Sequence, residues 1–198
     1  MHLIPVPNEN YQLIVVNNMH EVLVHRDYLG LTQEEAEGVE APAEATGSIK
    51  LVARVSVPQM SVGLVANDTL VIGTNIKNGW LQSFDIQTFE KTAQSSAMLA
   101  EAVTCMCLGE ESSTLIVGMN DSKVACIKAG RNFLEVLGSF NLGPSMKTFH
   151  SIQKTSRGDF AVGTVAGVCF IRWMSLERKF EIIRQTPTST SGPPLTLL

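Results

Sequence analysis

A chain of 198 residues, 44% hydrophobic and 17% charged, is long enough for a buried core and too apolar to remain disordered. No stretch approaches the roughly 18–20 uninterrupted apolar residues that cross a bilayer, and the start lacks the basic and apolar regions of a secretory signal. Four cysteines without a CxxC pair fit reduced thiols, which predicts a cytoplasmic or nuclear protein.

The net charge of −4 is unevenly distributed along the chain. Residues 1–58 carry three basic and eight acidic side chains, whereas residues 144–186 carry seven basic and three acidic ones. Such asymmetry can steer partners, but on the sequence alone scattered, solvated charges explain it better.

Residues 1–58 contain four short runs rich in apolar and β-branched residues, which predict four strands. A segment of 20 residues, 29–48, separates the last two runs, and it holds five glutamates and no basic residue. We predict that this segment is a flexible acidic loop, either a tolerated insertion or a contact for a basic partner. The four runs span residues 2–7, 11–18, 21–28 and 49–57.

One apolar run recurs three times in the rest of the chain. TLVIGT, TLIVGM and DFAVGT place their glycines at Gly73, Gly118 and Gly163, and each glycine follows the previous one by 45 residues. A glycine that repeats at a fixed step predicts a strand whose backbone lies close to a neighbouring sheet, since stacked sheets sit about 10 Å apart.

Each recurring run has one predicted strand before it and two after it, joined by turns rich in Asn, Asp and Gly. The repeating unit is therefore four antiparallel strands in about 45 residues. We place the units at residues 1–58, 59–100, 101–143 and 144–186, followed by a loose tail at 187–198. The strands predicted in the last three units are residues 61–66, 68–75, 79–86, 90–99, 102–108, 113–120, 123–130, 132–140, 148–154, 158–165, 167–174 and 179–186.

Four-stranded units at this period resemble the blades of a β-propeller of the WD-repeat kind. The resemblance covers residues 1–186 and implies an all-β fold, a WD40-like β-propeller of about four four-stranded antiparallel blades. Its motifs are degenerate, because Val16 replaces the glycine in the first unit and no Gly-His pair precedes any unit. The dipeptide that closes the third strand is Phe84-Asp85, Ile127-Lys128 and Arg172-Trp173 in the second, third and fourth units.

Four blades are few for a ring of this kind, which by resemblance usually has seven or eight. We therefore expect part of a larger ring, completed by another propeller segment, by a second copy of the chain or by sequence beyond it. A closed four-bladed ring is the alternative.

The sequence predicts no catalytic residue, no cofactor and no metal site. Cys105 and Cys107 lie two apart on a predicted strand, and we expect the cysteines to behave as small buried hydrophobic residues. No nucleophile, phosphate-binding or zinc-protease motif is present. Two alternatives stay open: a ligand-binding or enzymatic propeller whose site forms only in the complete ring, and nucleic-acid binding through the basic fourth unit. The second is less favoured, because the aromatic residues of that unit alternate along strands.

A noncatalytic scaffold that binds protein partners inside a larger assembly is the predicted function. The resemblance implies that the contact face consists of the turns between second and third strands and of the links between units. Trp80 would be an anchor of this face, with packing between blades as an equally good alternative. The predicted protein-binding residues are Met19, His20, Met60, Asn75, Lys77, Trp80, Asn120, Asp121, Met146 and Lys147.

Overall fold

The computed structural model describes residues 3–4, 12–16, 21–28, 48–57, 59–67, 69–86, 88–95, 99, 101–131, 133–146 and 148–187. The chain divides into two compact units, Met1–Pro58 and Gln59–Leu198. Within the described residues, every regular element is a β-strand except one short 3-10 helix. The structure is therefore all-β, as predicted.

The unit Met1–Pro58 contains one antiparallel sheet of four strands in chain order. The second strand pairs with the first and the third, and the third pairs with the fourth across a register shift between Val24 and His25. The predicted acidic loop, 29–48, lies outside the described residues apart from its last residue. The strands are β1 (Leu3–Ile4), β2 (Gln12–Val16), β3 (Glu21–Tyr28) and β4 (Ser48–Ser56).

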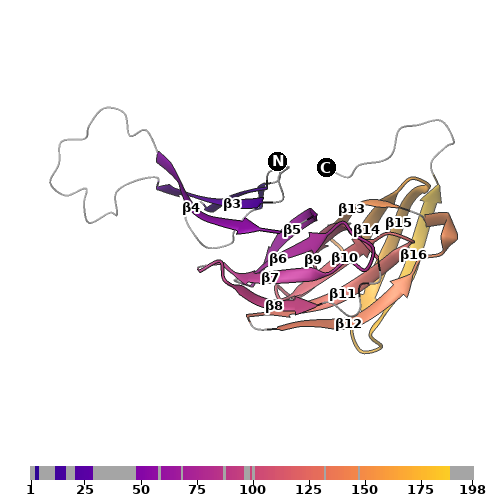
Figure 1. Ribbon diagram of the computed structural model, residues 1–198. Coiled ribbons are helices and arrows are strands. Elements are labelled where there is room, and N and C mark those ends of the chain that lie inside the picture. Colours follow the sequence, from indigo (N-terminus) through magenta and orange to yellow (C-terminus); the bar gives the residue numbers. More distant parts are fainter. Residues whose placement is uncertain are drawn as a thin grey trace, which may run out of the picture. The chain divides into compact units, whose positions relative to one another are not determined.

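The unit Gln59–Leu198 contains three antiparallel sheets, each of four strands in chain order (Figure 1). The first sheet consists of β5 (Met60–Ala66), β6 (Thr69–Thr74), β7 (Leu81–Asp85) and β8 (Lys91–Ser95). The second consists of β9 (Val103–Leu108), β10 (Thr114–Met119), β11 (Lys123–Gly130) and β12 (Phe133–Asn141). After the 3-10 helix η1 (Pro144–Met146), the third consists of β13 (Phe149–Lys154), β14 (Phe160–Thr164), β15 (Gly167–Met174) and β16 (Lys179–Pro187).

The three sheets stack face to face in the order of the chain. The first strands pack together, β5 on β9 and β9 on β13, and the fourth strands do the same, β8 on β12 and β12 on β16. This is the arrangement of propeller blades, with first strands on one side and fourth strands on the other. The stack is open: these three sheets do not close into a ring, in agreement with the predicted segment of a larger one.

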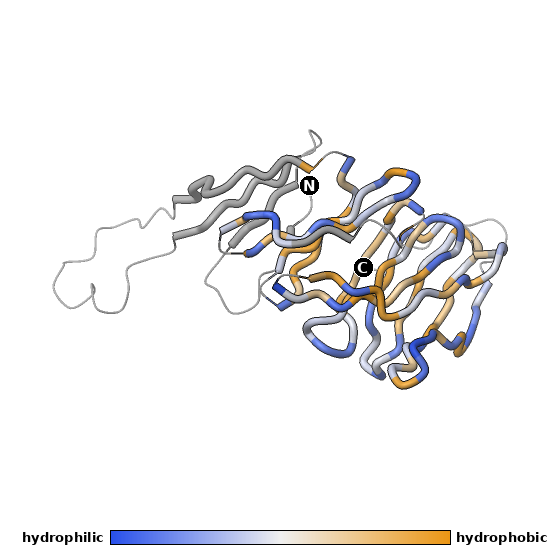
Figure 2. Tube along the Cα trace, turned by 60° about the horizontal axis from the view of Figure 1, so that its bottom comes forward, coloured by the Kyte–Doolittle hydropathy of each residue, from blue (hydrophilic) through white to orange (hydrophobic). Residues whose placement is uncertain are grey.

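Two hydrophobic cores fill the spaces between the sheets. Leu115 and Val117 of β10 point into the core shared with β5–β8, whereas Ile116 between them points into the core shared with β13–β16. Because both faces of the middle sheet are covered, β10 is buried along its whole length, and every residue after Thr114 is apolar. Figure 2 shows hydrophobic residues along the strands and hydrophilic ones mostly at the turns.

Two of the three repeated glycines, Gly73 and Gly118, lie against side chains of the next sheet. A Cβ atom on Gly73 of β6 would fall 2.5 Å from Cγ1 of Val103, which belongs to β9 of the next sheet. A Cβ atom on Gly118 would meet Sγ of Cys105 at 2.5 Å and Phe149 of the following sheet at 3.1 Å. The predicted close approach is confirmed at both positions, where core side chains occupy the place that a glycine Cβ atom would take.

Candidate protein-interaction site

A cleft of about 430 Å³ opens at one end of the stacked sheets. The β6–β7 turn and the β10–β11 turn form its walls, together with the links that lead into β9 and β13. Because strands alternate in direction, these turns and links all belong to the same end of their sheets. The cleft is lined by Lys77, Glu101, Ala102, Asn120, Asp121 and Thr148.

Backbone hydrogen bonds hold each turn against the link beside it. The amide of Asn75, two residues after the repeated Gly73, donates to the carbonyl of Gln59 at 2.7 Å. The amide of Asn120, two residues after Gly118, donates in the same way to the carbonyl of Ala102 at 2.9 Å. The same contact in successive sheets fixes both walls of the cleft to strand ends.

The β6–β7 turn is closed by Thr74 and Trp80. The hydroxyl of Thr74 accepts a hydrogen bond from the Trp80 amide at 3.0 Å and donates to the Trp80 carbonyl at 3.2 Å. Gly79 lies so close to the link that a Cβ atom would sit 2.7 Å from the Glu101 carbonyl oxygen. The turn that carries Lys77 is therefore pressed against the link of the next sheet.

Several cleft residues have the left-handed backbone conformation that sharp turns require. The φ angles of Asp121 and Ser122 are 57° and 64°, and that of Thr148 is 60°. Asn and Asp tolerate this conformation better than most residues, which fits Asp121 and, in the β6–β7 turn, Asn78 with a φ of 60°.

The charges of the cleft are of both signs. Glu101 is mostly buried and bonds through Oε1 to Nζ of Lys123 at 3.2 Å. Lys77 and Asp121 are exposed, one on each turn. The cleft thus presents a separate cation and anion beside neutral amide and hydroxyl groups, an arrangement that fits a polar polypeptide segment better than a uniformly charged polymer.

The overall architecture matches solved propeller structures. The mitotic checkpoint complex contains a chain with a TM-score of 0.66 and 11% identity, over 96% of this chain and 52% of that one. The WD40 repeats of RRP9 match with a TM-score of 0.61 and 13% identity, over 89% of this chain and 50% of that one. Sqt1 of Chaetomium thermophilum, bound to the N-terminus of ribosomal protein L10, matches with a TM-score of 0.60 and 12% identity, over 89% of this chain and 45% of that one. The fold is that of a WD40-like β-propeller. The chain spans about half the length of these neighbours, and neither a protein-family model nor a curated protein matches its sequence.

Three of the ten predicted binding residues of this propeller meet in the cleft. They are Lys77, Asn120 and Asp121, from two successive blades. Asn75 is exposed beside them, and Met60 is half-buried at the start of β5. Met19, His20 and Lys147 lie outside the described residues.

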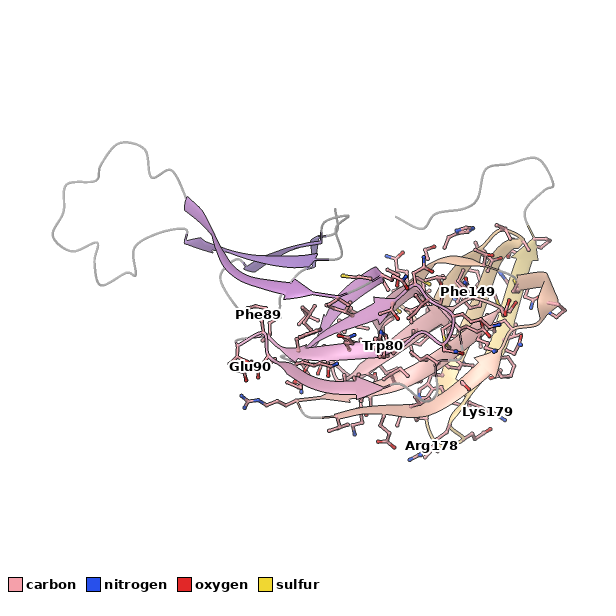
Figure 3. All side chains as sticks on the ribbon, in the orientation of Figure 1. Trp80, Phe89, Glu90, Phe149, Arg178 and Lys179 are labelled. Atoms are coloured by element: carbon pink, nitrogen blue, oxygen red, sulfur yellow. The ribbon has the colours of Figure 1, made fainter. Side chains whose placement is uncertain are left out.

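Trp80 and Met146 point elsewhere. Trp80 is half-buried next to β7 (Figure 3). Nζ of Lys91 lies 5.9 Å from the centroid of its ring. The buried indole N–H of Trp80 has no hydrogen-bond partner among the described residues. Met146 is only 5% exposed, because η1 directs it into the core, where the Thr164 hydroxyl lies 3.6 Å from its sulfur. Its side chain offers almost no surface to a partner.

Sequence reasoning missed Glu101, Ala102 and Thr148 as cleft residues. Thr148 directly follows the predicted Lys147, and the other two begin the link into the third predicted unit. The rule that links between units carry contacts would have found Glu101, whereas Ala102 and Thr148 had been assigned to the predicted strands 102–108 and 148–154, which begin one residue later in the structure.

The four cysteines are free, and three of them are buried. Burial raises the pKa of Cys105 and Cys169 to about 11 and that of Cys107 and Cys126 to about 12. Among the described residues, no three His, Cys, Asp or Glu side chains gather in a way that would hold a metal ion.

Proposed function

We propose that this chain is a noncatalytic protein-interaction scaffold that works inside a multiprotein assembly and binds a polypeptide segment of a partner in the cleft at the Lys77 and Asp121 turns. One observation carries the proposal: turns and links from successive blades, each fixed to a strand end by backbone hydrogen bonds, converge on one polar cleft. Loops on a rigid scaffold are the usual place for recognition residues.

The composition of the cleft favours a polypeptide as the ligand. A peptide backbone supplies donors and acceptors that pair with Asn120 and Thr148, while its charged side chains pair with Lys77 and Asp121. Two of the neighbouring structures support this by analogy, since one is a mitotic checkpoint complex and the other is Sqt1 bound to the N-terminus of ribosomal protein L10.

The cysteines also bear on where the protein works. Free thiols persist in reducing compartments, and all four cysteines are free. We therefore infer a cytoplasmic or nuclear location. In the described part of the chain, no helix is both long and apolar enough to pass through a membrane.

Reversal of both cleft charges tests the proposal. The variant Lys77→Glu with Asp121→Lys keeps the net charge, so any loss of binding comes from the position of the charges. Proteins captured by tagged chain from cell extract would be quantified by mass spectrometry for wild type and variant. We expect at least one captured partner to fall about tenfold.

Arg178→Glu is the control for a charge reversal away from the cleft, because Arg178 is exposed at the turn before β16, at the other end of its sheet from the turns that lead into third strands (Figure 3). Equal capture by wild type and the double variant would refute the cleft as the binding site. Equal losses in the double variant and the control would do the same.

A further inference from the structure

Within the unit Gln59–Leu198, no described strand outside β13–β16 covers the face of that sheet that points away from β9–β12. The buried face carries Phe160, Cys169 and Ile171, which belong to the core between the two sheets. The strand register places a different row on the opposite face: Gln153 pairs with Ala161, Ala161 with Phe170, and Phe170 with Arg184. We call this opposite face the terminal face.

The terminal face has an apolar centre and a basic rim. A cavity of about 400 Å³ lies on it, with Phe170 half-buried and Ile183 43% exposed. The guanidinium of Arg184 stacks over the Phe170 ring at 5.0 Å, and Arg157 stands at the edge of the same cavity. An apolar centre inside a charged rim is the anatomy of a protein–protein interface.

The charge of the terminal face is positive. One carboxylate, Asp159, lines its cavity and accepts from Arg172 at 2.7 Å, and the register places Glu181 of the same face opposite Arg172. Within the described part of the chain, neither Arg157 nor Arg184 forms an ion pair. Two cations are therefore left to attract an anionic partner.

We propose that the terminal face docks the acidic N-terminal unit, residues 1–58, of a second copy of this chain. Those residues carry eight acidic and three basic side chains, whereas residues 144–186 carry seven basic and three acidic ones, so the two ends of the chain have opposite charge. The N-terminal unit is itself a four-stranded antiparallel sheet, the kind of element that already covers the other face of β13–β16.

A ring of the neighbours' size has room for this occupant. Residues 1–198 cover 52%, 50% and 45% of three propeller neighbours, so about half of such a ring lies outside them. A contact between two different surfaces repeats around an axis, and it produces a ring when the rotation closes and a filament when it does not. A closed ring of two copies contains eight sheets, within the usual range of propellers.

Sedimentation velocity of the full chain tests the proposal. The wild type should form dimers whose dissociation constant rises when salt increases from about 0.05 to about 0.5 M, because screening weakens attraction between exposed charges. Arg157→Glu with Arg184→Glu should raise that constant about tenfold or more, while Lys128→Glu, which removes a cation from the middle sheet, should leave it unchanged.

Complementary charges supply the second arm. Glu21→Lys with Asp27→Lys, both in β3, lowers the negative charge of the N-terminal unit and should also weaken self-association. A mixture of this variant with the Arg157, Arg184 variant should form heterodimers more tightly than the arginine variant forms homodimers. Circular dichroism establishes that each variant is folded, and Arg157→Glu alone carries the test if Arg184→Glu does not fold.

Three results would overturn the proposal: a wild type that stays monomeric at all concentrations, arginine variants that dimerise like wild type, or a dimer that is insensitive to salt. None of these residues lines the cleft of Lys77 and Asp121. If self-association through the terminal face is refuted, the proposed function of the cleft is unaffected. If partner binding in the cleft is refuted, the proposed self-association is unaffected.

Discussion

Gly73 occupies the one place in β6 where the next sheet leaves no room for a side chain. The nearest atoms to an added Cβ are Cγ1 and Cβ of Val103, at 2.5 and 2.8 Å, and Val103 is fully buried. Alanine normally improves a strand position by about 0.5–1 kcal/mol relative to glycine, because the unfolded chain loses freedom. Overpacking in a filled core costs about 1–3 kcal/mol, so the clash decides the outcome.

We expect Gly73→Ala to lower the free energy of unfolding by about 0.5–2 kcal/mol, the difference between these two effects. Urea denaturation followed by circular dichroism measures it. The double variant Gly73→Ala, Val103→Ala should lose less stability than the sum of its single variants, since the smaller side chain relieves the clash. Strict additivity would show that the two residues do not press on each other.

The buried thiols should resist alkylation in the folded protein. Their pKa values of about 11 to 12 lie above the ordinary value of 9.0, because burial disfavours the thiolate. At pH 8 the thiolate fraction is then about a hundredfold or more lower than in the unfolded chain, and the thiolate is the reactive form. Iodoacetamide labelling with and without urea, read by mass spectrometry, measures the ratio. A folded-state rate close to the rate in urea would contradict this packing.

The same shifts set the sign of a pH effect on stability. Thiols of the unfolded chain ionise near pH 9, whereas the folded ones ionise near pH 11 to 12, so the folded state holds protons longer. The stability that these thiols contribute is complete below pH 9 and is lost as pH rises toward 12.

The aspartate of the WD-type dipeptide shows what residue patterns alone could and could not predict. Phe84-Asp85 was correctly matched to the end of a third strand, since Asp85 closes β7. The dipeptide assigned in the fourth unit, Arg172-Trp173, begins one residue too late. In the first sheet of the stack Leu70 pairs with Phe84, and the equivalent pair in the third sheet is Phe160 with Ile171. The residue after Ile171, Arg172, is therefore the equivalent of Asp85. Only strand register distinguishes these alternatives.

At the scale of elements, Asp85 links two sheets. Its Oδ2 accepts from Nε of Arg131, in the β11–β12 turn, at 3.0 Å, and its Oδ1 accepts from the Thr88 amide in the β7–β8 turn at 3.0 Å. The Asp85 side chain is 9% exposed and that of Arg131 is 75% exposed. Water can solvate the arginine without its partner, whereas the buried carboxylate needs its hydrogen-bond donors.

Asp85→Ala should therefore destabilise the protein more than Arg131→Ala. We expect a loss of about 1.5–3 kcal/mol for the aspartate, which holds the turn as well as the ion pair, and about 0–1 kcal/mol for the exposed arginine. Thermal and urea denaturation of both variants measure the difference. Equal losses would mean that the turn contact contributes nothing.

Most strands could be predicted because the period-two pattern and the turn residues repeat together. Thus β11 and β15 have the predicted bounds, 123–130 and 167–174, while β8 is described only at Lys91–Ser95 against a prediction of 90–99. The 3-10 helix Pro144–Met146 was not predicted, because a single turn leaves no periodic pattern. That turn is what buries Met146, one of the predicted contact residues.

At the scale of the whole molecule, the repeat predicted a stack and its open character but not the contents of the cleft. Lys77 and Asp121 are 44 positions apart, and equivalent turns carry them because the 45-residue step brings successive turns to the same end. The charge pairing of Glu101 with Lys123 could not be predicted, since it depends on how a link lies beside a turn of its own sheet. A sequence repeat predicts which turns lie at the same end of the sheets, but the packing of turns and links determines which side chains come into contact.

The central claim is that the cleft between turns is where a protein partner binds, and site-specific photo-crosslinking tests it most directly. A benzophenone side chain would replace Asp121 in the cleft or, as a control, Arg178 at the other turn, and each protein would be irradiated in cells. The account predicts partner adducts at position 121 that are absent or several-fold weaker at position 178. Adducts of equal yield at both positions, or only at position 178, would contradict it.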